Sequence, residues 1–122
     1  MRQIKFKGKS LTNGKWVEGD LLHGMHDSVM IRDAKFIAHD VDPETVCQYT
    51  GLKDANGREM WEGDIISCVQ DEPFIIGVLV YNEKTASFGV KENGYTYKLT
   101  LLVGTSCELY VRGNRFDKKE EA

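Results

Sequence analysis

Short alternations of apolar and polar residues run along most of this chain, and they predict strands rather than helices. In the first half the predicted strands are residues 2–7, 15–18, 21–23, 28–32 and 35–39. In the second half they are residues 64–70, 74–81, 87–91, 95–103 and 108–112, which are rich in Val, Ile, Tyr and Phe. Asn-Gly pairs at 13–14, 56–57 and 93–94, and a Gly-Asn pair at 113–114, predict turns between strands.

Helical signals are weak by comparison. No stretch of twelve residues keeps apolar side chains at helical spacing between caps. The best candidate is one turn beginning at Asp42, which could cap a helix that has Pro43 in its first position. The pattern therefore predicts an all-β protein with very little helix.

One local pattern occurs twice, at residues 13–22 and 56–66. Each copy has an Asn-Gly pair, a short strand carrying Trp16 or Trp61, a Glu-Gly-Asp sequence and an apolar strand. Gly can adopt backbone angles closed to other residues, and Asp can bond nearby amides, so the favoured interpretation is a structural corner at Gly19 and Gly63. The alternative is a pair of carboxylate sites, formed by Glu18 with Asp20 and by Glu62 with Asp64.

Composition narrows the class of protein. The chain has 122 residues and a net charge of −3, from 16 Lys and Arg against 19 Asp and Glu, so it lacks an overall basic character for nucleic acid. The longest apolar runs are four or five residues, far too short to span a membrane, and the N-terminus lacks the apolar core of a signal peptide. The cysteines Cys47, Cys68 and Cys107 are widely spaced and odd in number, which predicts reduced, buried thiols in a cytoplasmic protein.

Histidines and acidic residues offer a possible metal site. His23, His26, Asp27 and His39 could supply four ligands, but their spacing is not diagnostic of zinc, and loop or surface positions are favoured. Phosphate-binding glycine motifs and the Gly-x-Ser-x-Gly nucleophile motif are absent. We therefore expect no catalytic, cofactor-binding or metal-binding residue, and a protein that is not an enzyme.

Two basic segments, residues 5–9 and 112–115, could contact phosphates, and Tyr95, Tyr97 and Tyr110 could stack on bases. The favoured interpretation is that the tyrosines face inward and that lysines protect sheet edges from aggregation.

A long string in the middle of the chain is distinctive. Residues 41–54, VDPETVCQYTGLKD, lead into residues 56–66, NGREMWEGDII. Together with the N-terminal MRQIKFKG, the sequence WVEGDL at 16–21 and VRGNRF at 111–116, this string closely resembles the YopX family of small phage and prophage proteins.

The resemblance implies an N-terminal β subdomain that supports self-association, over residues 1–48, and a small SH3-like β-barrel over residues 49–116. A frayed charged tail would follow at 117–122. The resemblance also implies a phage or prophage accessory protein in the cytoplasm of a bacterial host. It implies no activity and no catalytic residue. We expect a non-enzymatic homo-oligomer that binds a protein partner and no membrane. The alternative is nucleic-acid binding through the SH3-like barrel, by fold analogy alone.

Overall fold

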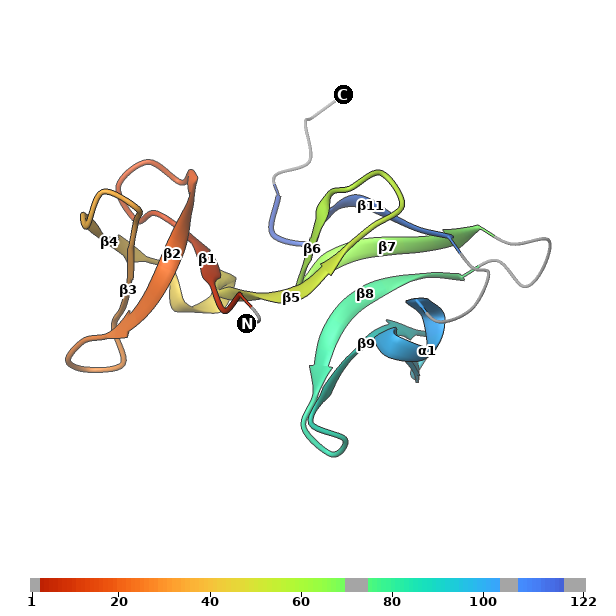
Figure 1. The fold of residues 1–122 in the computed structure, drawn as a ribbon. Helices are drawn as coiled ribbons and strands as arrows, with labels where there is room; N and C mark the ends of the chain where they lie inside the picture. The colour runs from red at the N-terminus through yellow and green to blue at the C-terminus, as the bar shows by residue number, and fades with distance from the viewer. Residues whose placement is uncertain (1–2, 70–74, 104–107, 118–122) are drawn as a thin grey trace, which may run out of the picture. The chain divides into compact units, whose positions relative to one another are not determined.

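A computed structural model describes residues 3–69, 75–103 and 108–117, and the chain divides into two compact units, Met1–Gly51 and Leu52–Ala122 (Figure 1). Strands dominate both units, which confirms the all-β prediction. The sequence placed the division after residue 48; in the structure it falls at Gly51, inside a strand. Each unit is described by itself.

Unit 1 is an antiparallel sheet in the order β4-β3-β2-β1-β5. Its elements are β1 (Phe6–Lys9), β2 (Trp16–His23), β3 (Val29–Arg32), β4 (Ala38–Val41), a 3₁₀ turn η1 (Pro43–Thr45) and β5 (Cys47–Lys53), which continues into unit 2. The predicted strand at 35–39 is therefore wrong in its first half, because residues 34 and 35 form a turn.

The first four strands close on themselves, because the end of β1 meets β4. Ser10 forms a bridge with Val41, and the Leu11 amide donates to the Asp40 carbonyl at 2.9 Å. Gly8 permits this approach, since a Cβ there would lie 3.0 Å from Cγ2 of Val41. Ile31 and Val41, at 0% and 1% exposure, fill the interior.

The predicted single helical turn is confirmed as η1. The Asp42 carboxylate accepts from the Glu44 amide at 3.0 Å, and Pro43 occupies the first position. The Thr45 hydroxyl oxygen accepts from the Lys9 amide at 2.9 Å, which ties the turn to β1.

Unit 2 contains a five-stranded antiparallel sheet in the order β10-β9-β8-β7-β11. Its elements are β6 (Glu59–Trp61), β7 (Asp64–Val69), β8 (Ile75–Asn82), β9 (Ser87–Glu92), β10 (Tyr95–Lys98), α1 (Leu99–Val103) and β11 (Glu108–Asn114). β6 pairs with β5 in the other sheet. Strands β7 to β10 form a meander, and β11 returns beside β7; whether this closes into an SH3-like barrel stays a prediction.

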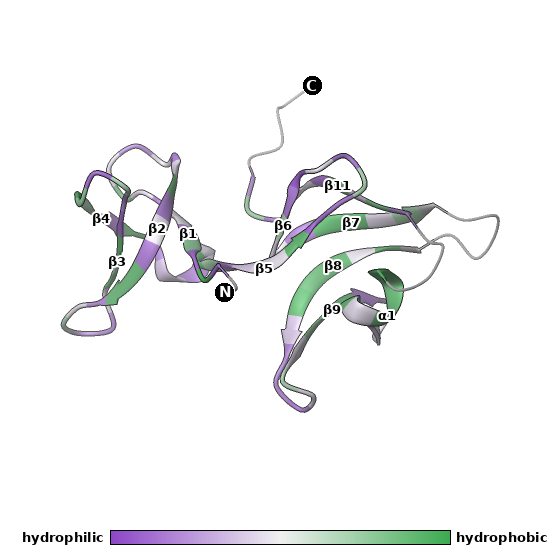
Figure 2. Cartoon of the chain, viewed as in Figure 1, coloured by the Kyte–Doolittle hydropathy of each residue, from purple (hydrophilic) through white to green (hydrophobic). Residues whose placement is uncertain are grey.

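The core of unit 2 lies on one face of this sheet. Fully or nearly fully buried side chains from β6 to β11 form it: Met60, Ile66, Cys68, Leu79, Val90, Leu99, Leu102 and Leu109. Figure 2 shows the hydrophobic residues running along β7 and β8 and in α1.

The prediction of a strand over residues 95–103 is wrong beyond Lys98, where the chain forms α1. Leu99 and Leu102 are buried, whereas Leu101 and Val103 are 66% and 44% exposed. Burial therefore follows the three-residue spacing of a helical turn, which a short unbroken apolar run does not reveal.

Two predicted turns have different outcomes. At Asn93-Gly94 both residues have positive φ, 50° and 82°, as a tight hairpin turn requires. The turn predicted at Gly113-Asn114 is wrong, because both residues belong to β11, beside a β-bulge after Val111. The predicted strand ends at residues 70 and 74 lie outside the described residues.

The cysteines do not share one state. Cys47 carries a buried thiol rather than a disulfide, as predicted. Cys68 is disulfide-bonded, so the prediction of a reduced thiol is wrong there; an odd and widely spaced set of cysteines carries no sign of pairing. Cys107 lies outside the described residues.

Candidate functional site

The second Glu-Gly-Asp sequence forms the predicted corner. Gly63, with φ of 87°, lies between β6 and β7, and its amide donates to the Leu79 carbonyl at 2.7 Å. The Asp64 carboxylate, 2% exposed as a residue, accepts from the Trp61 amide at 2.7 Å and from Nδ2 of Asn114 at 3.0 Å. This carboxylate is therefore engaged in holding the corner.

The first copy differs, and the predicted corner at Gly19 is wrong. Gly19 lies inside the continuous strand β2, paired with Phe6 of β1. Glu18 and Asp20 are both exposed, and each faces a cation: Nζ of Lys5 lies 3.7 Å from Glu18, and Arg32 lies 3.1 Å from Asp20. Each carboxylate pairs with its own cation rather than with the other.

The structure does not gather the candidate metal ligands. His23 is exposed at the end of β2, and His26 and Asp27 are exposed in the following turn. His39, in β4, instead lies against Asp33, with 2.8 Å between its Nε2 and Oδ2 of Asp33. Within residues 3–69, 75–103 and 108–117, no three His, Cys, Asp or Glu side chains are placed to hold a metal ion.

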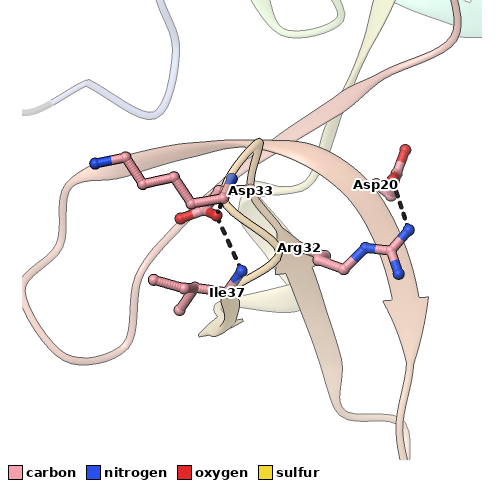
Figure 3. A network of polar contacts seen from close by, with 5 residues as sticks. Asp20, Arg32, Asp33 and Ile37 are labelled. Carbon is pink, nitrogen blue, oxygen red and sulfur yellow. Dashed lines mark hydrogen bonds and ion pairs between the residues drawn. The ribbon is translucent and has the colours of Figure 1, made fainter.

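Asp33 organises the hairpin between β3 and β4, a role that the sequence analysis missed (Figure 3). Its Oδ1 accepts from the amides of Lys35 at 2.9 Å and Ile37 at 3.0 Å, as the carboxylate turns back into the loop. The bond with His39 and these amide bonds lower the pKa of Asp33 below its ordinary value. The hairpin holds Phe36 at φ of 65°, with 79% of its surface exposed.

An exposed aromatic residue held in a left-handed conformation is unusual, because this conformation is unfavourable for bulky side chains. The Arg32 guanidinium lies 5.5 Å from the centre of the Phe36 ring, and the same guanidinium donates to Asp20 at 3.1 Å. In Figure 3 the Arg32 side chain reaches toward Asp20. Asp33 and Arg32 therefore present Phe36 to solvent.

Asp54 has the corresponding role in unit 2. Its carboxylate accepts from the amides of Asn56, Arg58 and Val111, at 2.9, 2.8 and 2.9 Å. Burial alone would raise the pKa of this carboxyl, but the three amide bonds and the nearby Arg58 charge lower it below the ordinary value. Asp54 thus joins the β5–β6 turn to β11.

A further surface lies along β10 and α1, with Tyr95 and Leu101 as its exposed apolar side chains. We call it the β10 edge and define it by Tyr95, Thr96, Tyr97, Lys98, Leu101 and Leu102. These residues line a hollow of about 290 Å³. Tyr95 is 63% exposed, and its ring meets Tyr97 edge to face, with 4.6 Å between ring centres. β10 is the last strand in the order of its sheet, and no described strand pairs with its other edge.

The basic and aromatic residues proposed for nucleic acid are divided among several places. In unit 1, Nζ of Lys7 and of Lys9 lies 4.6 and 5.2 Å from the centre of the Trp16 ring. In unit 2, Arg112 lies 5.6 Å from the Tyr110 ring on β11, at the opposite end of the strand order from Tyr95 and Tyr97. The three tyrosines do not share a strand or a common edge.

Comparison with known proteins identifies the family. The model of the YopX protein family matches residues 5–120, nearly the whole chain. The chain belongs to the YopX family. No curated protein matches this YopX-family chain. In its described residues no helix is long and apolar enough to cross a membrane.

Proposed function

We propose that this YopX-family protein is a non-enzymatic phage or prophage accessory protein that associates with itself and binds a protein partner. One observation carries the proposal: large apolar side chains are exposed along the β10 edge and the end of α1. Tyr95, Leu101 and Val103 are 63%, 66% and 44% exposed. Apolar side chains clustered at the surface beside an open strand edge are typical of protein-binding surfaces.

Self-association is supported by unit 1, where Leu11, Met25 and Phe36 are 67%, 77% and 79% exposed. We expect size-exclusion chromatography with light scattering to give a mass above that of one chain, and the change Phe36→Ser to lower it. Lys35→Ser, one residue away and also exposed, is the matched control. A monomeric wild-type protein at micromolar concentration would rule out self-association.

The non-enzymatic part of the proposal rests on the lack of any catalytic motif in the sequence. Its test is a thermal-melting series with Zn²⁺, Mn²⁺ and Mg²⁺, because a metal that binds only the folded chain must raise the midpoint. An unchanged midpoint is expected. A rise of several degrees with one metal would favour a metal-dependent enzyme instead.

We propose the cytoplasm of a bacterial host as its compartment, following the family resemblance. Cell fractionation provides the test. We expect the protein in the cytosolic fraction of the host. Recovery with the periplasmic markers, in an oxidising compartment where the Cys68 disulfide would be stable, would refute the proposal.

Nucleic-acid binding is the second candidate, supported by the two arginines near the end of the chain. The guanidinium groups of Arg112 and Arg115 lie 5.6 and 4.7 Å from the centres of the Tyr110 and Phe116 rings. Arginine and aromatic side chains together can contact phosphates and stack on bases. Mobility shifts with short single- and double-stranded DNA, repeated over a salt series, test it; no shift at low salt would refute it.

A further inference from the structure

We infer that the β10 edge binds an extended segment of a partner protein in which acidic and apolar residues alternate. This inference rests on the proposed protein-binding function and adds the chemistry of the partner. Its basis is the different character of the two faces of β10, one aromatic and apolar and the other basic.

The register of β10 with β9 assigns each side chain to a face. Tyr95 lies opposite Glu92 and Tyr97 opposite Val90, while Thr96 lies opposite Lys91. Residues directly opposite each other in an antiparallel pair share a face, and successive residues of a strand alternate between faces. One face of the edge therefore carries Tyr95 and Tyr97, and the other carries Thr96, Lys98 and Lys91.

The aromatic face is the side on which an apolar partner residue would be bound. Tyr97 packs against the core of unit 2, while Tyr95 and Leu101 remain 63% and 66% exposed beside the hollow of about 290 Å³. This volume is slightly below the roughly 300–1,000 Å³ of small-ligand pockets, which suits one apolar side chain rather than a whole ligand. A strand added beside β10 would place every second side chain over this hollow.

The opposite face carries positive charge. A second hollow, of about 500 Å³, has Thr96 in its lining together with Lys84 and Lys91. Lys84, Lys91 and Lys98 are all exposed, and no carboxylate of the described residues lies within ion-pair distance of any of them. The negative group in the lining of the same hollow is Glu83. Glu92 lies opposite Tyr95, on the aromatic face, and its carboxylate accepts from the Ile76 amide at 2.6 Å.

Charge complementarity therefore selects an acidic partner segment. A new strand would lie about 5 Å from β10 and about 10 Å from β9, so its acidic side chains could reach both Lys98 and Lys91. Opposite charges across strands stabilise the pairing, and like charges weaken it. The other interpretation is that Lys98 only protects the edge from aggregation, in which case no peptide would bind.

The test uses the full ¹⁵N-labelled chain and capped heptapeptides that alternate valine with glutamate, glutamine or lysine. We expect the glutamate peptide to shift the amide signals of β10 and α1 and to bind most tightly. Reversing one charge, in Lys98→Glu or Lys91→Glu, should weaken its binding about tenfold. Lys53→Glu, at an exposed lysine on β5, is the matched control and should leave binding unchanged.

A glutamate peptide that carries backbone N-methyl groups should lose binding, because a strand joins a sheet edge through its amides. Equal binding by the glutamine or lysine peptide would refute the acidic specificity and leave the protein-binding function intact. If no peptide shifts the β10 signals, the β10 edge is not a protein-binding site, and the proposed function loses the observation that carries it.

Discussion

Asp54 provides the strongest test of how unit 2 is held together. Asp54 is 8% exposed, and three backbone amides donate to its carboxylate. The amides of Asn56 and Arg58 share Oδ1, whereas the Val111 amide donates to Oδ2 from 57 residues further along the chain. Removing this carboxylate should therefore loosen both the β5–β6 turn and the attachment of β11.

The change Asp54→Asn keeps the shape of the side chain and removes its charge. Its amide oxygen can still accept the two amides of the turn, but its NH₂ group faces the Val111 amide as a second donor. A hydrogen bond to a charged group contributes about 1.5–3 kcal/mol, and a buried donor left unsatisfied costs a similar amount. We expect a loss of about 3 kcal/mol, a large part of the roughly 5–15 kcal/mol that stabilises a typical domain.

The loss is measured by urea unfolding followed through Trp61 fluorescence, with Trp16→Phe in every variant so that unit 2 alone is observed. Glu83→Gln is the control, because Glu83 is exposed in the turn that follows β8 of the same unit. Exposed charges of this kind contribute about 0–1 kcal/mol. The reasoning is refuted if Asp54→Asn destabilises unit 2 no more than Glu83→Gln does.

The same carboxylate predicts a dependence on pH. The pKa of Asp54 is lower in the folded protein than its ordinary value of 3.8, so the unfolded chain binds this proton more readily. Its stabilising contribution is therefore complete well above pH 3.8 and is lost as the pH falls through the lowered pKa. The difference in stability between wild type and Asp54→Asn should be constant near neutral pH and shrink below about pH 4. A difference that stays constant down to pH 2 would contradict the assigned role.

Two further predictions concern single positions. Gly19→Ala should destabilise unit 1 by about 3 kcal/mol, because its Cβ would lie 1.9 Å from the Arg32 carbonyl oxygen. Gly14→Ala should cost about 1 kcal/mol, because φ there is 71° but no atom lies within 4 Å of the added Cβ. Thermal melting of both variants measures the two losses, and equal losses would contradict this ranking. The hydrogen bond from the Tyr110 hydroxyl to Glu108 raises the pKa of Tyr110, so Glu108→Gln should lower that pKa in an ultraviolet titration; an unchanged value would refute the assignment.

Local sequence signals predicted local structure well where one or two residues determine the backbone. Asp42 caps the helical turn by accepting from the Glu44 amide, and Pro43 begins it. Asn93-Gly94 supplies the two positive φ angles of a hairpin turn. The strand over residues 95–103 could not be divided correctly in this way. The burial of Leu99 and Leu102 decides that α1 is helical, and this burial depends on the core of the whole unit.

The candidate surfaces were harder to predict, because they depend on contacts and strand register rather than on one or two adjacent residues. The sequence pattern places Phe36 in a strand, because residues 33–36 include no glycine or proline that would mark a turn. Only the contacts of Asp33 with Ile37 and His39 turn this segment into a hairpin with an exposed aromatic tip. Likewise, the basic face at Lys91 and Lys98 appears only when β9 and β10 are paired in register.

The two Glu-Gly-Asp sequences show why a repeated motif need not repeat a structure. At Gly63 the following aspartate is buried and finds the Trp61 amide and the side chain of Asn114, so the chain turns there. β2 pairs with β1 as far as Gly19 and with β3 from Asp20 onward, and the Arg32 carbonyl lies where a side chain of residue 19 would be. The glycine is therefore required for close packing within a continuous strand. The same three residues thus serve two different needs, an anchored turn and a close approach of strands. The partner of the aspartate decides between them, a buried asparagine in one copy and an exposed arginine in the other.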